Sequence, residues 1–114
     1  MPQLFKKKGK TFIGNLIPAQ SLKQRIQGLT VYSELQKNEV FWIPSCPSIH
    51  TFFMKFPIDV VFTDSEFKVL SLFSEVQSGR ILFGGLKSRN VFEMKIGQIL
   101  SCQLSKGESL YVEP

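Results

Sequence analysis

Residues 39–63 read E-V-F-W-I-P-S-C-P-S-I-H-T-F-F-M-K-F-P-I-D-V-V-F-T, and this stretch decides the fold. Prolines and polar residues divide it into apolar runs at 40–43, 49–56 and 58–63. β-Branched and aromatic residues dominate each run, which is typical of β-strands. The polar segment 64–66 then predicts a turn, and the alternation from Phe67 to Val76 predicts the returning strand of a hairpin. We therefore expect successive short strands that pair mainly in antiparallel fashion.

The rest of the chain adds elements on both sides of this stretch. In chain order they are a strand at 12–17, a helix that begins after Ser21, a strand at 91–94, a short helix within 96–104 and a final strand at 110–112. A chain of 114 residues has room for one ordinary core. The sequence therefore predicts an α+β fold: a single small β-rich domain with a mostly antiparallel, barrel-like sheet and two short helices.

Positive charge is concentrated at the N-terminus. The formal net charge is +5, and Lys6, Lys7, Lys8 and Lys10 supply four of the positive charges. We therefore divide the chain into a basic arm at 1–10 and a single domain at 11–114. Basic arms contact phosphates or anionic lipid in some proteins, but solvated lysine runs at chain ends are common, so this pattern disfavours nucleic-acid binding.

Two cysteines, Cys46 and Cys102, are too few for a disulfide framework and lack the close paired spacing of a structural zinc site. No apolar run approaches the roughly 18 residues of a membrane-spanning helix. The segment 11–19 has the charge and apolar order of an export signal, but Gly14 and Asn15 interrupt it. We therefore expect a cytoplasmic protein without a transmembrane segment, and we predict no metal and no cofactor.

The stretch from Cys46 to Phe62 contains the single histidine, and its residues allow two kinds of functional site. Cys46, His50 and Met54 together suit copper(I), and Cys46 with His50 and Asp59 would suit nucleophilic catalysis. Both face the same objection, because residues four apart on an extended strand are separated by about 13 Å. A sharp bend beside Pro47 would be needed. Cys46, Met54 and Lys55 are therefore secondary candidates.

Asp59 is more informative, because it lies inside an apolar run. A carboxylate there is costly unless it is paired or reaches water. Arg25, on the border of the apolar face of its helix, and His50 are the candidate partners. Glu93 alternates with Phe92 and Met94, which is also the pattern of the solvated face of a strand.

The enzymatic motifs with strong mechanistic signatures are absent from the sequence. There is no G-x-S-x-G, H-E-x-x-H or C-x-x-C, and the pair Gly84-Gly85 lacks the spacing of a phosphate-binding loop.

The pattern Cys46-x-x-Ile49-His50-Thr51-Phe52-x-Met54-x-Phe56-Pro57-Ile58-Asp59-Val60-x-Phe62 resembles the central signature of the domain of unknown function 192 family, a group of small, mostly prokaryotic proteins. Segments 19–29, 91–97 and 106–107 resemble flanking elements of the same family. The resemblance implies a compact, β-rich α+β domain and supplies no activity. It also places Arg25, His50, Asp59 and Glu93 on motif positions, which favours a shared polar cluster over unrelated surface residues.

We therefore predict a small binding or accessory protein whose polar cluster of Arg25, His50, Asp59 and Glu93 lines a shallow pocket or braces the sheet. The alternative is an enzyme of unknown reaction that uses Cys46 or His50 with Asp59. The partner would be an unidentified small molecule or protein, and an exposed ridge at Phe52 and Phe53 leaves a homo-oligomer open.

Overall fold

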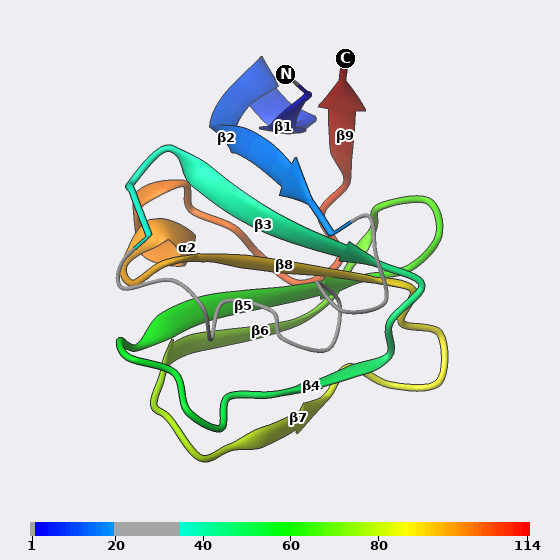
Figure 1. The fold of residues 1–114 in the computed structure, drawn as a ribbon. Coiled ribbons are helices and arrows are strands. Elements are labelled where there is room, and N and C mark those ends of the chain that lie inside the picture. Colours follow the sequence, from blue (N-terminus) through cyan, green and yellow to red (C-terminus); the bar gives the residue numbers. More distant parts are fainter. Residues whose placement is uncertain (1, 20–34) are drawn as a thin grey trace.

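A computed structural model of the chain describes residues 2–19 and 35–114 (Figure 1). Nine strands, a 3₁₀ turn and a short helix lie in these residues. They are β1 (Gln3–Lys6), η1 (Lys8–Lys10), β2 (Thr11–Pro18), β3 (Glu39–Pro44), β4 (Ser48–His50), β5 (Ile58–Thr63), β6 (Val69–Val76), β7 (Ile81–Phe83), β8 (Asn90–Lys95), α2 (Gln98–Ser101) and β9 (Leu110–Glu113).

Seven strands form one sheet in the order β6-β5-β8-β3-β2-β1-β9. All neighbouring pairs are antiparallel except β2 and β3, which run parallel. The hairpin that the sequence predicts at 58–76 is confirmed as β5 and β6. Asp64 forms its turn, because the Asp64 carboxylate accepts hydrogen bonds from the backbone N–H groups of Glu66 and Lys68, each at 2.9 Å. The large sheet is therefore mostly antiparallel, as the sequence predicts.

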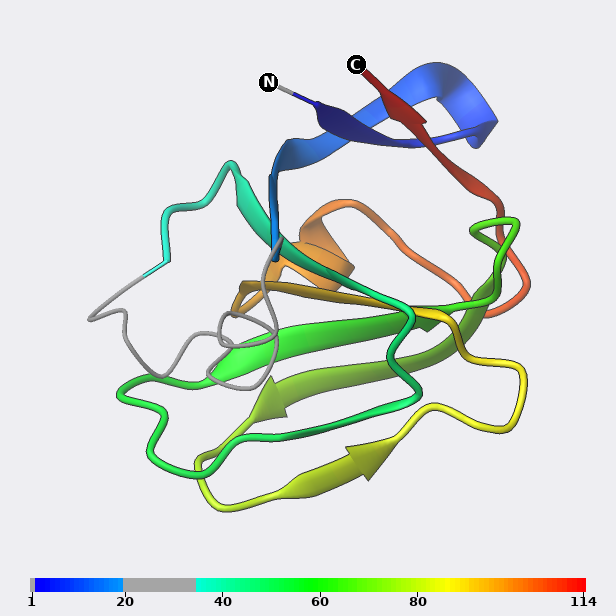
Figure 2. The same cartoon turned by 45° about the vertical axis from the view of Figure 1, so that its right-hand side comes forward.

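The large sheet buries both of its faces. All six residues of β5 are buried, because successive side chains point to opposite faces and each face is covered. One face packs Val61, Phe92 and Met94 with α2, and the other packs Val60 and Val91 with the small β4–β7 sheet, which we call the ribbon. Figure 2 shows α2 and the ribbon on opposite sides of the central strands. The continuous apolar run of β5 is thus explained by burial on both sides.

The sheet is not closed into a barrel. Its edge strands are β6 and β9, and among the described residues they are joined by no ladder, only by an isolated bridge between Lys68 and Ser109, which directly precede these strands. The barrel-like architecture expected from the sequence is therefore not confirmed. Within residues 2–19 and 35–114, α2 is the one α-helix, so the expected pair of helices is not confirmed either. The helix expected after Ser21 lies outside the described residues.

The strand expected at 49–56 is wrong beyond His50. β4 ends there, and Thr51 turns the chain: its hydroxyl donates to the carbonyl of Gln77 at 2.7 Å and accepts from the N–H of Arg80 at 2.8 Å. Phe53 then adopts a positive φ of 66°, which is incompatible with a strand. A buried side-chain hydrogen bond to a distant segment overrides the local β-propensity of these residues.

Part of the expected N-terminal arm belongs to the sheet. β1 pairs with β2 on one side and β9 on the other, and Leu4 is fully buried. The Lys6 ammonium lies 3.2 Å from the Glu108 carboxylate and donates to the carbonyl of Gln103 at 2.9 Å. Lys6 is therefore a paired, mostly buried cation, whereas Lys7, Lys8 and Lys10 are exposed.

Candidate functional site

Asp59 lies on β5 and is fully buried. One carboxylate oxygen accepts from the backbone N–H of Glu75 on β6, and the other accepts from the N–H of Ile99 in α2, each at 2.9 Å. The first N–H groups of a helix have no partner within the helix, so a carboxylate there satisfies a donor and complements the helix dipole. The residue at the N-cap of α2, Gly97, has no side chain to do this. Asp59 therefore acts as a remote cap that joins β5, β6 and α2.

Glu93 lies on β8 and is 2% exposed. Its Oε1 atom has no hydrogen-bond partner among the described residues. Burial raises the pKa of this carboxyl to about 8, because desolvation penalises the charged form. At neutral pH the protonated form is therefore favoured. Glu93 is not the solvated strand residue that simple alternation suggests.

The structure places Asp59 and Glu93 on opposite faces of the large sheet. Asp59 is opposite Met94 in the β5–β8 register, on the face that holds α2. Glu93 is opposite Val60, on the face covered by the ribbon. These two members of the expected cluster therefore do not share a site. Arg25, the expected cation of the cluster, lies outside the described residues.

His50 lies at the end of β4 and is exposed. Its ring stacks on Phe52, with the centroids 5.2 Å apart. Within the ribbon, Ile49 and Leu82 face the core, so the alternate residues His50, Ile81 and Ser48 face outward. His50 is therefore directed away from the face that contains Glu93.

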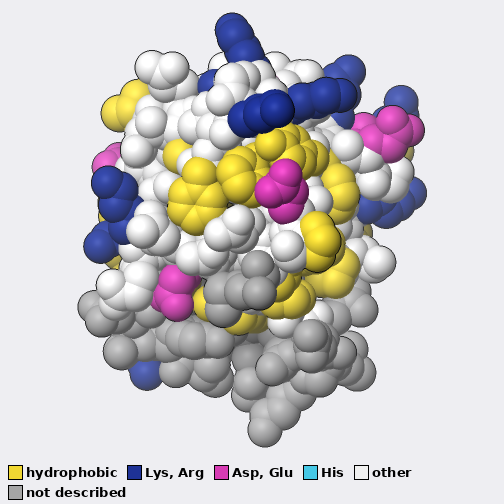
Figure 3. Space-filling view, turned by 90° about the horizontal axis from the view of Figure 1, so that it is seen from above, with side chains coloured by type: hydrophobic (Ala, Val, Ile, Leu, Met, Phe, Trp, Pro, Cys, Tyr) yellow, Lys and Arg dark blue, Asp and Glu magenta, His cyan; other side chains and the backbone are white. Residues whose placement is uncertain are grey.

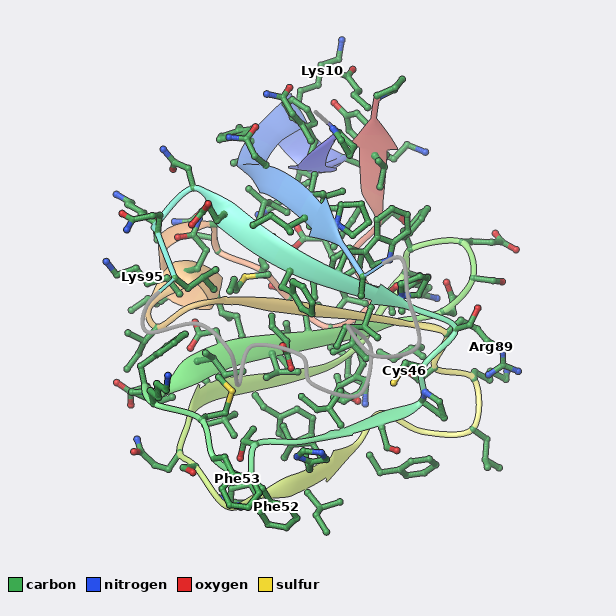
Figure 4. All side chains as sticks on the ribbon, in the orientation of Figure 1. Lys10, Cys46, Phe52, Phe53, Arg89 and Lys95 are labelled. Carbon is green, nitrogen blue, oxygen red and sulfur yellow. The ribbon has the colours of Figure 1, made fainter. Side chains whose placement is uncertain are left out.

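The cysteine-based alternatives gain no support from the contacts of these residues. The Cys46 thiol donates to the carbonyl of Ser48 at 2.8 Å, and in Figure 4 Cys46 lies at the opposite end of the ribbon from Phe52. Met54 is buried in the core and Lys55 is exposed. No group of three or more His, Cys, Asp or Glu residues suited to hold a metal occurs within 2–19 and 35–114.

Cys102 is buried near α2, and burial raises the pKa of its thiol. A raised pKa disfavours the thiolate, which is the nucleophilic form. Both Cys46 and Cys102 are free thiols.

The outer face of the ribbon is the surface feature that sequence reasoning largely missed. Phe53 is 85% exposed, Ile81 70% and Phe83 56%, and Phe52 lies beside them. Phe52 and Phe53 are labelled at the lower end of the ribbon in Figure 4. The expected ridge at 52–53 is thus one end of a longer apolar strip, which we call the ribbon strip: Phe52, Phe53, Ile81 and Phe83. The signal for its second half was the short apolar segment between Gly79 and Gly84.

Shallow cavities lined by described residues open elsewhere. One of ≈ 290 Å³ lies beside Asp59 and is lined by Ser74, Glu75, Gly97 and Leu100. Another of ≈ 490 Å³ lies along β9 and is lined by residues of both charge signs, including Lys7, Lys10, Glu66 and Glu113. Figure 3, which views the molecule from above, shows a carboxylate within an apolar area and lysine or arginine side chains beside it. The charged residues that line the first cavity, Asp59 and Glu75, are both acidic, whereas the second cavity has both signs.

The sequence profile of the family DUF192, described as Uncharacterized ACR, COG1430, matches residues 4–112. This chain belongs to the DUF192 family. Within the described residues of this DUF192 chain, no helix is long and apolar enough to cross a membrane.

Relatives of this DUF192 chain occur in archaea of the genus Thermococcus. UPF0127 protein TK1120 of Thermococcus kodakarensis is 27% identical over 111 residues, which cover 94% of this chain and 70% of that protein. A UPF0127 protein of Thermococcus gammatolerans is 30% identical over 105 residues, which cover 89% and 68% of the two chains.

Two crystal structures have the same fold. A protein of unknown function from Novosphingobium aromaticivorans DSM 12444 has a TM-score of 0.82 at 15% identity, with 96% of this chain and 82% of that chain covered. A protein from Sinorhizobium meliloti 1021, described as a candidate transcription regulator, has a TM-score of 0.83 at 17% identity, with 97% and 91% covered. At these identities the likeness shows the fold alone.

Proposed function

We propose that this chain is a binding or accessory domain that contacts a macromolecular partner through the ribbon strip. The exposure of Phe53 carries the proposal. Burial of a phenylalanine side chain would contribute roughly 2 to 3 kcal/mol to folding, and this domain forgoes that contribution. Ile81 and Phe83 on β7 are also exposed and forgo the corresponding contribution to folding. Clustered rather than scattered apolar exposure is the usual mark of an interaction surface.

Backbone strain supports the same reading. Phe53 has a φ of 66°, a left-handed conformation that is costly for a bulky residue. The Phe53 side chain points outward in this conformation and does not pack in the core. Phe67 has a similar φ of 64° but packs against the core, so Phe53 differs in that burial does not offset the cost of its conformation.

In this proposal the buried polar residues serve the fold. Asp59 satisfies backbone donors of β6 and α2, and Glu93 sits in the protonated form between packed layers. His50 belongs to the outer surface, where it stacks on Phe52 beside the strip. Two free thiols fit a reducing compartment, so we retain the cytoplasm as the proposed location.

Site-specific photo-crosslinking in cells of the source organism tests the proposed surface. The photoreactive residue p-benzoylphenylalanine would replace Phe53 or Phe83 in separate variants, because it is itself a phenylalanine derivative. Leu100 provides the matched control position, since it is 82% exposed but lies on α2, on the other side of the large sheet. We expect a discrete adduct from positions 53 and 83 and none from position 100. Equal adducts at all positions, or none at 53 and 83, would overturn the proposal.

A further inference from the structure

The outer edge of β7 carries unpaired backbone groups. In the β4–β7 register Ile49 lies opposite Leu82, and the flanking bonds run from Gly84 N–H to Pro47 carbonyl at 2.8 Å and from Thr51 N–H to Arg80 carbonyl at 2.8 Å. Hydrogen-bonded and non-hydrogen-bonded pairs alternate along an antiparallel ladder. The pair Ile49–Leu82 is therefore hydrogen-bonded.

The same alternation makes Ile81 and Phe83 members of non-hydrogen-bonded pairs. The N–H and C=O groups of Ile81 and Phe83 consequently point away from β4. β4 is the only strand that pairs with β7 among the described residues. In Figure 1, β7 is the outermost strand at the lower side of the molecule, with no described element beyond it.

The two edges of the large sheet are protected in ways that β7 is not. The start of β6 and the segment before β9 bond to each other, with Val69 N–H donating to the Glu108 carbonyl at 2.8 Å. The exposed part of β6 carries Glu75, and β9 ends at Glu113. Charged side chains on an edge oppose pairing with another strand. β7 instead presents Ile81 and Phe83, which are 70% and 56% exposed.

The approach to this edge is open at both ends. Gly79 precedes β7 and Gly85 follows it, and an added Cβ at either glycine would meet no heavy atom within 4 Å. An incoming extended chain would therefore encounter no side chain of these residues. Access, free donors and acceptors, and apolar side chains coincide at one short strand.

Charge identifies the chemistry of the incoming chain. The ribbon and its flanking loops occupy residues 45–57 and 77–89, and these segments contain Lys55, Arg80, Lys87 and Arg89 but no aspartate or glutamate. A second copy of this chain would bring the same cations face to face, which is repulsive. An acidic partner would be complementary.

We propose that β7 binds an extended acidic peptide segment of a partner protein as an added antiparallel strand. This inference rests on the proposed function and specifies its partner and mode. Backbone bonds to Ile81 and Phe83 hold the segment, and alternate apolar residues of the segment pack on the ribbon strip. Its carboxylates face Arg80 and Lys87 at the two ends of β7.

Heteronuclear NMR titration of the full chain with a short capped peptide of alternating valine and glutamate tests the inference. We expect the amide signals of Ile81 and Phe83 to shift, and a peptide with lysine in place of glutamate to bind at least about tenfold more weakly. If the lysine peptide binds equally well, or if the glutamate peptide causes no shift at β7, the inference is wrong.

Two variants at one position separate backbone pairing from side-chain contact. Phe83→Ala keeps the outward N–H, whereas Phe83→Pro removes it, and proline is tolerated on a strand edge whose N–H faces solvent. We expect Phe83→Pro to bind about tenfold more weakly than Phe83→Ala, the effect of one lost hydrogen bond. Unchanged amide signals of β5 and β8 would show that each variant is folded, and Ile81→Pro against Ile81→Ala repeats the comparison if Phe83→Pro is not. Equal affinities within the pair would overturn strand addition.

Other outcomes distinguish this inference from the proposed function. A single-stranded DNA oligonucleotide that shifts the ribbon signals, when the peptide does not, would overturn the peptide partner and keep the ribbon strip as the contact surface. If the ribbon signals shift with protein concentration in the absence of peptide, the partner is a second copy of this chain and not an acidic peptide. If neither the oligonucleotide nor a higher protein concentration shifts the ribbon signals, and positions 53 and 83 give no crosslinked adduct, the proposed function itself is wrong.

Discussion

Asp59 stabilises two backbone donors that the fold leaves without other partners. Both donors, from Glu75 and Ile99, reach it from elements that are distant in the sequence. A buried donor that loses its acceptor costs roughly 1 to 3 kcal/mol. The carboxylate is therefore a point at which β5, β6 and α2 depend on one side chain.

We expect Asp59→Ala to lower the free energy of unfolding by about 2 to 4 kcal/mol, measured by urea denaturation followed by circular dichroism. Asp64→Ala is the matched control, because Asp64 also accepts two backbone N–H groups but in an exposed turn, where water replaces it. Its expected cost is below about 1 kcal/mol. Equal losses in the two variants would show that Asp59 is not a buried cap.

Glu93 makes stability depend on pH. Its pKa is raised from 4.5 to about 8 in the folded state, so between these values the folded chain holds a proton that the unfolded chain has released. The free energy of unfolding therefore falls as pH rises, by about 1.4 kcal/mol per pH unit from this group, and levels off above the folded-state pKa.

We expect Glu93→Gln to remove this component, so that the variant gains stability relative to wild type as pH increases from 5 toward 8. Denaturation series at several pH values measure the difference. Glu113→Gln, an exposed carboxylate on β9, should leave the pH profile unchanged. A pH-independent difference between wild type and Glu93→Gln would contradict a raised pKa.

At the scale of elements, the ribbon is attached less extensively than the strands at the centre of the sheet. β5 and β8 each have a paired strand on both sides, whereas β4 and β7 pair only with each other among the described strands. Gly84 lets the end of the ribbon approach the ring of Phe62, because a Cβ at this position would overlap that ring. The ribbon is thus a separate layer that packs closely against the large sheet at Gly84.

Hydrogen exchange should resolve this difference. We expect the amide of Leu82 to exchange faster than those of Val61 and Phe92, because local opening of a two-stranded layer requires fewer broken contacts than global unfolding. Gly84→Ala should accelerate exchange further in β4 and β7 while leaving β5 and β8 protected. Uniform protection across all of these amides would contradict a separately opening ribbon.

For the whole molecule, the ribbon strip and the net charge of +5 act in opposite directions on self-association. Like charges keep copies apart at low ionic strength, and salt screens them: the Debye length is about 10 Å at 0.1 M and about 3 Å at 1 M. Apolar contacts are not screened. Exposed apolar surface should therefore begin to pair copies only when the charges are screened.

We expect a mass near that of one 13.0 kDa chain at low salt and a rising dimer fraction at high salt, measured by light scattering after size exclusion. Phe53→Ser should reduce the high-salt dimer, and Leu100→Ser, an equally exposed site on α2, should not. A dimer that is strongest at low salt would show instead that opposite charges join the copies.

Much of the β-structure could be predicted because it depends on neighbouring residues. The hairpin at 58–76 follows from two apolar runs and a turn whose aspartate bonds within four residues. The strand expected at 49–56 fails at Thr51, because that side chain bonds to Gln77 and Arg80. No local pattern reports such a contact. The same limit applies to β1, which is short and is held by pairing with β2 and β9.

By itself, the sequence determined the β-rich class, the hairpin and the family, because strand propensity, turn chemistry and a long motif are properties of consecutive residues. Only the tertiary structure decided that Asp59 and Glu93 face opposite sides of the sheet and that His50 stacks on Phe52 beside the ribbon strip. Those relations depend on strand register and on which layer covers each face. Register and layering are set by contacts between residues that are distant in the chain, so they arise only when the whole molecule folds.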